Sequence, residues 1–415
     1  MRTVLSLLRL PSIVLFAAGM NHASIAQTTS PATKQYATLG NPASTLATPD
    51  GRYLLVSETN VDGPNFTGAD AAAGTRKDVI SGVQVFRTEH GELTPLQFIK
   101  IGGAGANGLV LLPGAKTLVV GVGDSGVAFL DVDAVLRGDA VPIFADQGSA
   151  AGTFDIVASK DGRYIFSANE YGVIDGQRGN VGITATNIDA SGHVQHPNLI
   201  GHIPLGDVVP SLSLSANGSH LYVATEIPPA NHSVAIAGAS NPTLSRSDCV
   251  QGKGTTPKQG GYISVIDTER AIHGDANPVL LRIASGCSPV RIVESRNGSA
   301  LFVSARGDNV VLEFDPSKLT HDPEHAFRRA IPTGGTAPVG LHLFDHDRKL
   351  AVANSNRFDN APGTLALFDL HGAASLQAKI LPAGQFPRNL STSSDGALLY
   401  LTNFSSRTVQ VIALK

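Results

Sequence analysis

The chain has 415 residues, of which 42% are hydrophobic and 16% are charged, and its formal net charge is −3. These values are typical of a globular protein and lack the large basic excess of proteins that bind nucleic acids or anionic membranes. We therefore expect no nucleic-acid partner.

The N-terminus has the pattern of a secretory signal peptide. Two arginines precede the apolar run Leu10–Gly19, and Ser24–Ala26 supplies the small residues that a signal peptidase reads. We interpret residues 1–26 as a removed signal peptide and residues 27–33 as a disordered polar tail, which predicts a secreted or periplasmic protein. An uncleaved anchor helix is the alternative, but the run contains a proline and is short for a membrane span. No membrane span is expected after signal removal.

A short pattern recurs along the rest of the chain. Its clearest copy is Val157–Asn169, in which apolar residues flank the turn dipeptide Asp161-Gly162 and predict a β-hairpin. Aligning the turns gives seven copies of a unit of about 49 residues, and short strands at such a period are typical of propeller blades. The aligned turn residues are Gly51, Gly114, Gly162, Gly218, Gly298, Asp347 and Gly396.

The two ends of the repeat array complement each other. The chain ends after only three strands of the seventh copy, whereas Lys34–Leu39 has the character of a fourth strand without its first three. We expect the N-terminal strand to complete the last blade and so to remove the open sheet edges of the ring. The predicted fold is all-β: a single seven-bladed β-propeller domain of four-stranded blades over residues 34–415.

Three insertions follow second strands and should lie on one face of the disc, where first strands begin and second strands end. We call it the upper face. The insertions Asn60–Ile80, Tyr171–Gly179 and Ile227–Gly260 are rich in Gly, Ala, Ser, Pro and Asn, which predicts loops. The opposite face carries histidines that we interpret as solvated, because no fixed metal-ligating partner accompanies them. They are His193, His196, His273, His321 and His325.

Both cysteines fall in the part predicted to be exported, where disulfides form. Cys249 lies in the insertion of the fourth copy and Cys287 at the entry to the fifth, so both belong to the upper face near one blade boundary. We expect them to be bonded. Two unpaired buried thiols are the alternative.

Polar side chains recur where the predicted inner strands enter the central channel. The aligned series is Ser44, Asn107, Asp155, Ser211, Arg291, Gly340 and Asn389, and Arg388 stands beside its last member. The first positions after the second strands add Glu58, Glu170, Glu226, Arg306, Asp308, Asn356 and Arg357. Facing charges of both signs can bind a polar or anionic small molecule and shift one another's pKa values. A water-filled channel lined by mutually satisfied ion pairs is the alternative.

The repeat unit resembles a known family. The pattern Ser159–Asn169, with a third strand such as Gly261–Asp267, is similar to the repeats of the YVTN-repeat propellers. That group overlaps the 6-phosphogluconolactonase-like, lactonase-type seven-bladed propellers. The resemblance covers scaffold residues over nearly all of the mature chain. It implies a seven-bladed disc, with lactone hydrolysis in some relatives and binding or surface roles in others.

Two functions fit this pattern. The first is a hydrolase of a small polar or anionic lactone or ester, in which Glu170 or Asp155 activates water or protonates the leaving oxygen and Arg291 and Arg388 stabilise anionic groups. The second is a non-catalytic propeller that binds a small molecule or a protein through its upper loops. The remaining candidates would bind the ligand: Glu58, Asn107, Glu226, Arg306, Asp308, Asn356, Arg357 and Asn389. No motif requires a cofactor, and a divalent metal in the channel stays open.

Overall fold

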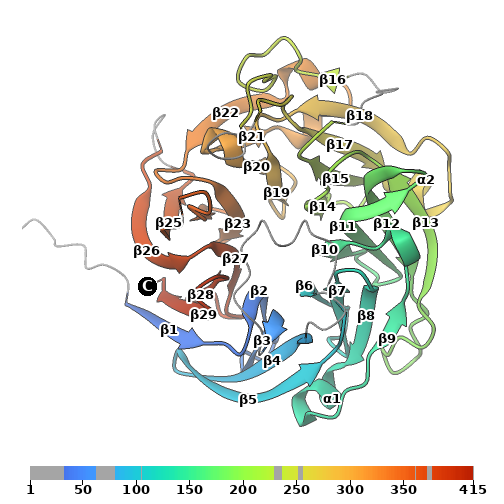
Figure 1. Ribbon diagram of the computed structural model, residues 1–415, viewed down its shortest axis with the longest axis vertical. Coiled ribbons are helices and arrows are strands. Elements are labelled where there is room, and N and C mark those ends of the chain that lie inside the picture. Colours follow the sequence, from blue (N-terminus) through green and yellow to red (C-terminus); the bar gives the residue numbers. More distant parts are fainter. Residues whose placement is uncertain are drawn as a thin grey trace, which may run out of the picture. The chain divides into compact units, whose positions relative to one another are not determined.

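The computed structural model describes residues 32–61, 80–103, 105–228, 236–250, 256–359, 361–371 and 376–414. These residues form seven β-sheets arranged as blades of a ring (Figure 1). The predicted signal peptide and nearly all of the predicted tail lie outside the described residues. In the described part, no helix is long and apolar enough to cross a membrane.

Each blade contains four antiparallel strands, and its first strand lies nearest the centre of the ring. Blade 1 consists of β2 (Asn41–Ala47), β3 (Tyr53–Val61), β4 (Ile80–Glu89) and β5 (Glu92–Lys100). Blade 2 consists of β6 (Ala106–Leu111), β7 (Thr117–Val122), β8 (Gly126–Asp131) and β9 (Ile143–Ala145). Blade 3 consists of β10 (Thr153–Ala158), β11 (Tyr164–Ile174), β12 (Gln177–Ala185) and β13 (Asn198–Pro204). Blade 4 consists of β14 (Ser211–Leu214), β15 (His220–Thr225), β17 (Tyr262–Asp267) and β18 (Val279–Ala284). Blade 5 consists of β19 (Pro289–Glu294), β20 (Leu301–Ala305), β21 (Val310–Phe314) and β22 (Phe327–Pro332). Blade 6 consists of β23 (Pro338–Phe344), β24 (Lys349–Asn354), β25 (Pro362–Asp369) and β26 (Lys379–Gln385). Blade 7 consists of β27 (Pro387–Thr392), β28 (Leu398–Asn403), β29 (Thr408–Ala413) and β1 (Thr33–Ala37).

The predicted closure of the ring is confirmed. β1 pairs antiparallel with β29, from Thr33 opposite Ile412 to Ala37 opposite Thr408, so the N-terminal strand is the outer strand of blade 7. The chain then passes through Leu39 and Gly40 into the innermost strand of blade 1. Blade 7 is therefore built from both ends of the repeat array, and its sheet has the same four-strand order as the others.

The turn between the first two strands of each blade requires a left-handed residue. Gly162 has φ +73°, and Asp347 adopts φ +63° at the copy for which the sequence offers no glycine. In blade 2 the predicted alignment is wrong by one residue. Ala115, with φ +53°, donates its N–H to the Leu112 carbonyl as the turn glycines do elsewhere, so it replaces Gly114 in the repeat. This shift matters for the site described below.

Two of the predicted loops contain regular structure. Tyr171–Gly179 is mostly a β-hairpin, because β11 continues to Ile174 and β12 begins at Gln177. The insertion Ile227–Gly260 contributes β16 (Ile236–Ala237), which pairs parallel with β18 and gives blade 4 a fifth strand. The insertion Asn60–Ile80 lies mostly outside the described residues. The expectation that all three are loops is therefore wrong for one and incomplete for another.

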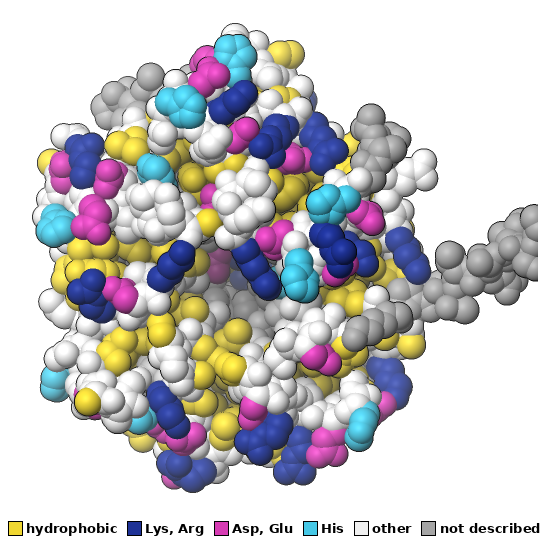
Figure 2. All heavy atoms as spheres, turned by 180° about the vertical axis from the view of Figure 1, so that it is seen from behind, with side chains coloured by type: hydrophobic (Ala, Val, Ile, Leu, Met, Phe, Trp, Pro, Cys, Tyr) yellow, Lys and Arg dark blue, Asp and Glu magenta, His cyan; other side chains and the backbone are white. Residues whose placement is uncertain are grey.

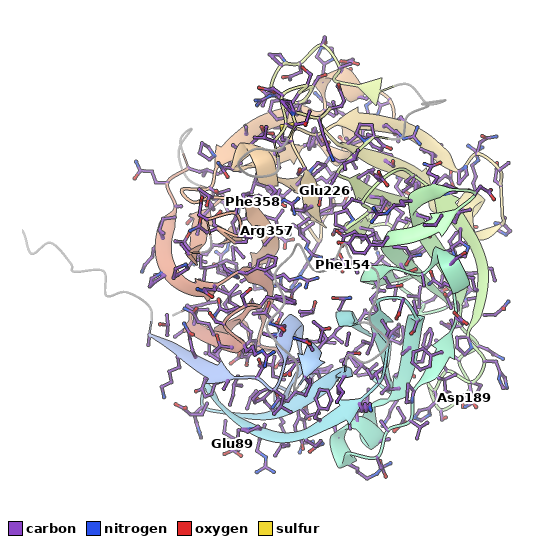
Figure 3. All side chains as sticks on the ribbon, viewed as in Figure 1. Glu89, Phe154, Asp189, Glu226, Arg357 and Phe358 are labelled. Carbon is purple, nitrogen blue, oxygen red and sulfur yellow. A yellow bond between two sulfur atoms is a disulfide. The ribbon has the colours of Figure 1, made fainter. Side chains whose placement is uncertain are left out.

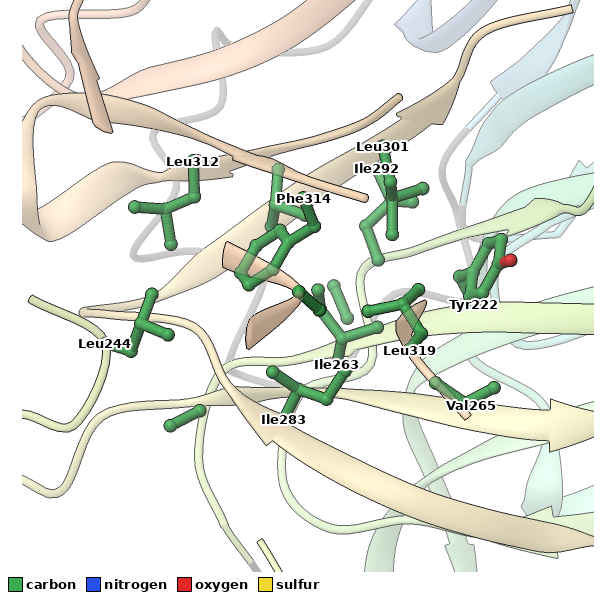
Figure 4. Packing of buried hydrophobic residues seen from close by; sticks show 14 of the residues in the cluster. Tyr222, Leu244, Ile263, Val265, Ile283, Ile292, Leu301, Leu312, Phe314 and Leu319 are labelled. Atoms are coloured by element: carbon green, nitrogen blue, oxygen red, sulfur yellow. The ribbon is translucent and has the colours of Figure 1, made fainter. Parts of the chain in front are cut away.

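Apolar side chains that alternate along the strands pack between neighbouring blades. Figure 4 shows the cluster between blades 4 and 5, where Tyr222 and Ile263 of one sheet meet Leu301 and Phe314 of the next. The short helices α1 (Val132–Arg137) and α2 (Thr268–Ile272) follow third strands, and Asp131 and Asp267 cap their N-termini. In the view from behind, basic and acidic side chains are interspersed among the coloured residues rather than gathered by sign (Figure 2).

Candidate functional site

The inner strands place side chains at the upper face through a repeated backbone device. In six blades the pairing of the first two strands shifts register near the start of the first strand, as between Thr153 and Asp155. Such a β-bulge redirects a side chain and bends the strand. The inner strands also contact one another from blade to blade around the ring. The bulged residues therefore point toward a shared centre, which we call the upper mouth.

A backbone hydrogen bond fixes a second set of residues beside these bulges. In blades 3 to 7 a residue at the upper end of the second strand donates its N–H to the carbonyl of a left-handed residue shortly before the first strand. The donors are Glu170, Glu226, Arg306, Ser355 and Phe404, and the acceptors are the carbonyls of Gly152, Val208, Ser288, Ala337 and Phe386, at 2.8 to 3.0 Å. Blades 3 to 7 thus each present two neighbouring side-chain positions to the upper mouth.

Asp155 and Arg291 form an ion pair across blade 4. Arg291 Nη1 lies 2.6 Å from Asp155 Oδ2, and both side chains are largely buried. The same carboxylate oxygen accepts a hydrogen bond of 2.8 Å from the Ser211 hydroxyl. The structure therefore joins three members of the predicted polar series, from blades 3, 4 and 5. Both charged members are already partnered, which suits a scaffold role better than the predicted catalytic role.

Arg388 reaches from blade 7 to the opposite side of the ring. Its guanidinium lies 4.3 Å from the centre of the Phe154 ring in blade 3 and 5.1 Å from that of Phe404. Its Nη2 lies 3.4 Å from Asn107 Oδ1 in blade 2. Burial, followed by repulsion from Arg291, lowers the pKa of Arg388 to about 10, so it stays cationic at neutral pH.

A second arginine cluster stands next to it. Arg306 of blade 5 forms a buried ion pair of 2.7 Å with Glu226 of blade 4 and lies 5.6 Å from the Phe358 ring. Arg357 of blade 6 lies 5.5 Å from the Phe358 ring and 5.2 Å from the Phe386 ring. Burial lowers the pKa of Arg357, and Arg306 adds to this effect. In Figure 3, Phe154, Glu226, Arg357 and Phe358 lie around the centre of the ring, whereas Glu89 and Asp189 lie at its periphery.

Glu170 is the carboxyl group whose titration matters most here. It is buried, and its Oε2 has no hydrogen-bond partner. Burial raises the pKa of Glu170 to about 7, and the charge of Glu226 adds to the rise, while Tyr171, Arg388 and Arg306 oppose it. Burial and the charge of Glu170 also raise the pKa of Tyr171. Glu170 can therefore exchange a proton near neutral pH.

Glu58, Asp308, Asn356 and Asn389 do not join this cluster. Glu58 pairs with Pro42 as Asn169 pairs with Thr153, so it lies one residue before the position of Glu170. Because successive side chains of a strand point to opposite faces, it is directed away from the mouth. Its Oε2 accepts the Gly40 N–H at 2.6 Å, and the side chain is fully buried.

The other three have local structural partners. Asp308 accepts hydrogen bonds from Arg246 and from the Cys287 N–H, which ties the fourth insertion to blade 5. Asn356 bonds Thr336 and the Pro362 carbonyl. Asn389 Oδ1 accepts the Thr45 N–H at 3.4 Å between blades 7 and 1.

The predicted disulfide is confirmed: Cys249 and Cys287 are bonded.

Sequence reasoning missed the aromatic side chains of the site. With the register of blade 2 corrected, Asn107, Phe154 and Arg388 occupy the same repeat position, the bulged residue, at which the remaining blades carry Ala43, Pro210, Val290 and Val339. Large or polar residues at that position were a signal that a correct alignment would have shown. Phe404 stands at the repeat position of Glu226 and Arg306, so the same comparison would have found it.

The cluster favours an anionic ligand. Four guanidinium groups face three carboxyl groups, one of which has a pKa of about 7: Arg291, Arg306, Arg357 and Arg388 against Asp155, Glu170 and Glu226. Among the described residues, no group of three or more His, Cys, Asp or Glu side chains could hold a metal ion.

Comparisons with known proteins support the fold alone. No family model and no curated protein matches the chain. Among solved structures, the β-propeller domain of Cps50 (Swd1) from Myceliophteria thermophila superposes with a TM-score of 0.57. The alignment covers 92% of this chain and 100% of that domain, at 11% sequence identity. The protein is thus a seven-bladed β-propeller, and its function must be argued from the upper mouth.

Proposed function

We propose that the protein binds a small organic anion at the upper mouth, through Arg357 and Arg388. The observation that carries this proposal is that no carboxylate of the described residues lies within ion-pair distance of either guanidinium group. Arg388 is buried and Arg357 half-buried, so neither charge is fully solvated. Glu170 and Glu226 act on these charges only from beyond ion-pair distance. A buried cation without a direct ion-pair partner is costly, and an anionic ligand would reduce that cost.

The aromatic residues support the same proposal. Phe154 and Phe404 lie against Arg388, and Phe358 and Phe386 lie against Arg357. Rings that cover a guanidinium face leave the N–H groups in its plane able to donate. A carboxylate can accept two such donors at once, which makes the contact strong and directional. The site therefore suits a ligand with one planar anionic group.

Binding of benzoate, succinate and inorganic phosphate to the purified protein, measured by isothermal titration calorimetry, tests this function. We expect at least one carboxylate to bind, and Arg388→Met and Arg357→Met each to weaken it by about 10–100-fold, as is typical of charge-assisted hydrogen bonds. Arg137→Met, at an exposed helical site, is the matched control. If none of the probes binds, or both variants bind as the unaltered protein does, the proposal is wrong.

Hydrolysis of a lactone or ester is a second candidate, favoured by Glu170. Its carboxylate would take a proton from water, the water oxygen would add to the acyl carbon, and Arg388 would donate to the oxyanion. Collapse would break the bond to the alkoxy oxygen, which leaves with the proton from Glu170 and gives the hydroxy acid. The resemblance of the repeat to lactonase-type propellers supports the same reaction.

The pH dependence separates the two functions. Ionisation of Glu170 near pH 7 adds a negative charge to the mouth, so anion affinity should fall as the pH rises through 7. A general base must be ionised, so kcat/KM of a lactonase should instead rise over the same range. Glu170→Gln should abolish either dependence. Lactone turnover that survives in Glu170→Gln with the same pH profile would exclude Glu170 as the base.

A further inference from the structure

Blade 4 contains a buried arginine that the upper mouth does not use. Arg282 lies on the outer strand β18 and is 6% exposed, and its Nε and Nη1 atoms have no hydrogen-bond partner. No carboxylate among the described residues lies within 4.0 Å of it, the limit that defines the ion pairs found elsewhere in the chain. Its guanidinium lies 5.2 Å from the centre of the Tyr262 ring. The Arg282 side chain also forms a hydrogen bond with Tyr262, but its Nε and Nη1 atoms lack an acceptor.

Two buried hydroxyl groups lie next to Arg282. Ser264 stands directly opposite Arg282 on the neighbouring strand β17. Thr225 of β15 is opposite Tyr262, two residues from Ser264 on β17, and therefore lies on the same face of the sheet. Both residues are fully buried; Ser264 Oγ has no hydrogen-bond partner, and Thr225 Oγ1 has none apart from the Tyr262 side chain. Directly opposed side chains in an antiparallel pair have Cβ atoms about 5 Å apart. Four potential donors, from three side chains, thus share one face of blade 4.

That face packs against blade 3. Val223 is opposite Ser264 and belongs to the apolar cluster with Ala168 and Val181. The Tyr262 hydroxyl donates to the Leu205 carbonyl of blade 3. The unpartnered donors therefore lie between two blades, where water is scarce.

Comparison of the blades shows that the scaffold does not need a cation there. The lateral row Val223, Ser264 and Arg282 has apolar equivalents in blades 2, 5 and 6: Val120, Ala128 and Phe144; Val303, Leu312 and Ala330; Val352, Ala366 and Ile380. Three of the neutral polar members of the row in other blades are partnered, whereas the buried Nε2 of His202, the counterpart of Arg282 in blade 3, has no hydrogen-bond partner. Gln84 accepts the Leu39 N–H, Ser167 bonds Gln147, and Gln410 donates to the Pro382 carbonyl. Arg282 differs from these residues because its guanidinium group carries a permanent charge.

We propose that a monovalent inorganic anion of halide size, chloride under ordinary conditions, binds between blades 3 and 4 on Arg282, Ser264 and Thr225. Water alone would satisfy the hydroxyl groups but leave the charge of Arg282 uncompensated in a poorly solvated place, which is costly. A halide supplies the charge and accepts several donors without a fixed direction. The donor atoms each expose less than 1 Å², so an anionic group attached to a larger molecule does not fit this site.

The test is calorimetric melting of the mature protein in chloride and in isethionate, a large organic sulfonate, at constant ionic strength. An anion that binds only the folded state raises its stability with the logarithm of concentration, and for a chain of this size this raises Tm by about 2 °C per tenfold increase above the dissociation constant. We expect this rise in chloride and bromide, and not in isethionate. Arg282→Leu should lose it and still fold, because apolar residues occupy the equivalent position in blades 2, 5 and 6.

Two controls separate this site from the others. Arg388→Met should keep the chloride effect, which distinguishes it from anion binding at the upper mouth. Arg87→Leu, which replaces an exposed arginine of strand β4, should keep it as well. Crystals grown in bromide should show an anomalous peak in contact with Arg282 Nε or Nη1. An equal Tm in chloride and isethionate, a chloride effect that survives Arg282→Leu, or only water at this place in bromide crystals would overturn the proposal.

Discussion

Replacing Glu58 by Gln tests whether this carboxyl group belongs to the scaffold or to the ligand site. Its Oε2 accepts the Gly40 N–H at 2.6 Å, its Oε1 has no partner, and the side chain is 0% exposed. Burial raises the pKa of Glu58 from 4.5 to about 8, although the backbone N–H groups of Gly40 and Leu39 and the charge of Arg407 oppose this. The folded protein therefore holds a neutral Glu58 at physiological pH.

The sign and size of the effect follow from proton linkage. Between pH 4.5 and 8 the unfolded chain has lost this proton and the folded chain keeps it, so the free energy of unfolding falls as the pH rises. One pKa unit corresponds to about 1.4 kcal/mol, so the shift sets an upper limit of about 5 kcal/mol. Relaxation and water entry reduce this to the order of 3 kcal/mol. Glutamine does not titrate and lacks this loss.

Urea unfolding of both proteins at pH 5 and pH 8 measures the difference, since the other titrating groups cancel between them. We expect Glu58→Gln to gain on the order of 3 kcal/mol relative to the unaltered protein over this interval, with unchanged anion binding at the upper mouth. A stability difference that is the same at both pH values would refute the buried neutral carboxyl. Weaker ligand binding in the variant would return Glu58 to the site.

Three further outcomes are expected. Deleting Thr33–Ala37 should abolish cooperative melting, because blade 7 loses its outer strand; a truncated protein that melts within a few degrees of the intact one would contradict ring closure. Replacing both Cys249 and Cys287 by Ala should lower the free energy of unfolding by about 3–4 kcal/mol, measured by denaturant titration, and reduction of the unaltered protein should match it. Arg291→Ala should cost about 3–5 kcal/mol by leaving Asp155 buried without its partner; a second change, Asp155→Asn, should recover most of that loss in a double-mutant cycle, and full additivity would exclude the coupling.

The repeat explains why so much of the fold could be predicted. Each Asp-Gly or Asn-Gly turn marks a hairpin through local chemistry, and the spare N-terminal strand is visible because the seventh copy lacks one. Blade 2 shows the limit of that reasoning. Its glycine stands one residue before the left-handed position that Ala115 fills, and sequence propensity favours the glycine. That single error placed Asn107 in the wrong series.

The site was predictable in part, and the rest depended on side-chain direction. Glu170, Glu226 and Arg306 share one repeat position and share the mouth, whereas Glu58 is displaced by one residue and faces the other side of its strand. Ion pairing between Asp155 and Arg291 links blades that are not neighbours. No sequence spacing reveals such a contact, because it depends on bulges that turn the two side chains toward the same centre.

Because the backbone repeats from blade to blade, a side chain that differs from its equivalents in the other blades is informative. Bulges recur at corresponding points of the inner strands, so residues at one repeat position lie at a similar height in each blade. Arg388 of blade 7 therefore meets Phe154 of blade 3, although the two are 234 positions apart in the sequence (388 − 154). At that position Ala43 and Val290 show what the scaffold alone requires. Arg282 stands in a different row but departs from its apolar equivalents in the same way. These residues are costly to bury, and other blades of the same ring fold without them. We therefore propose that they serve a ligand rather than stability.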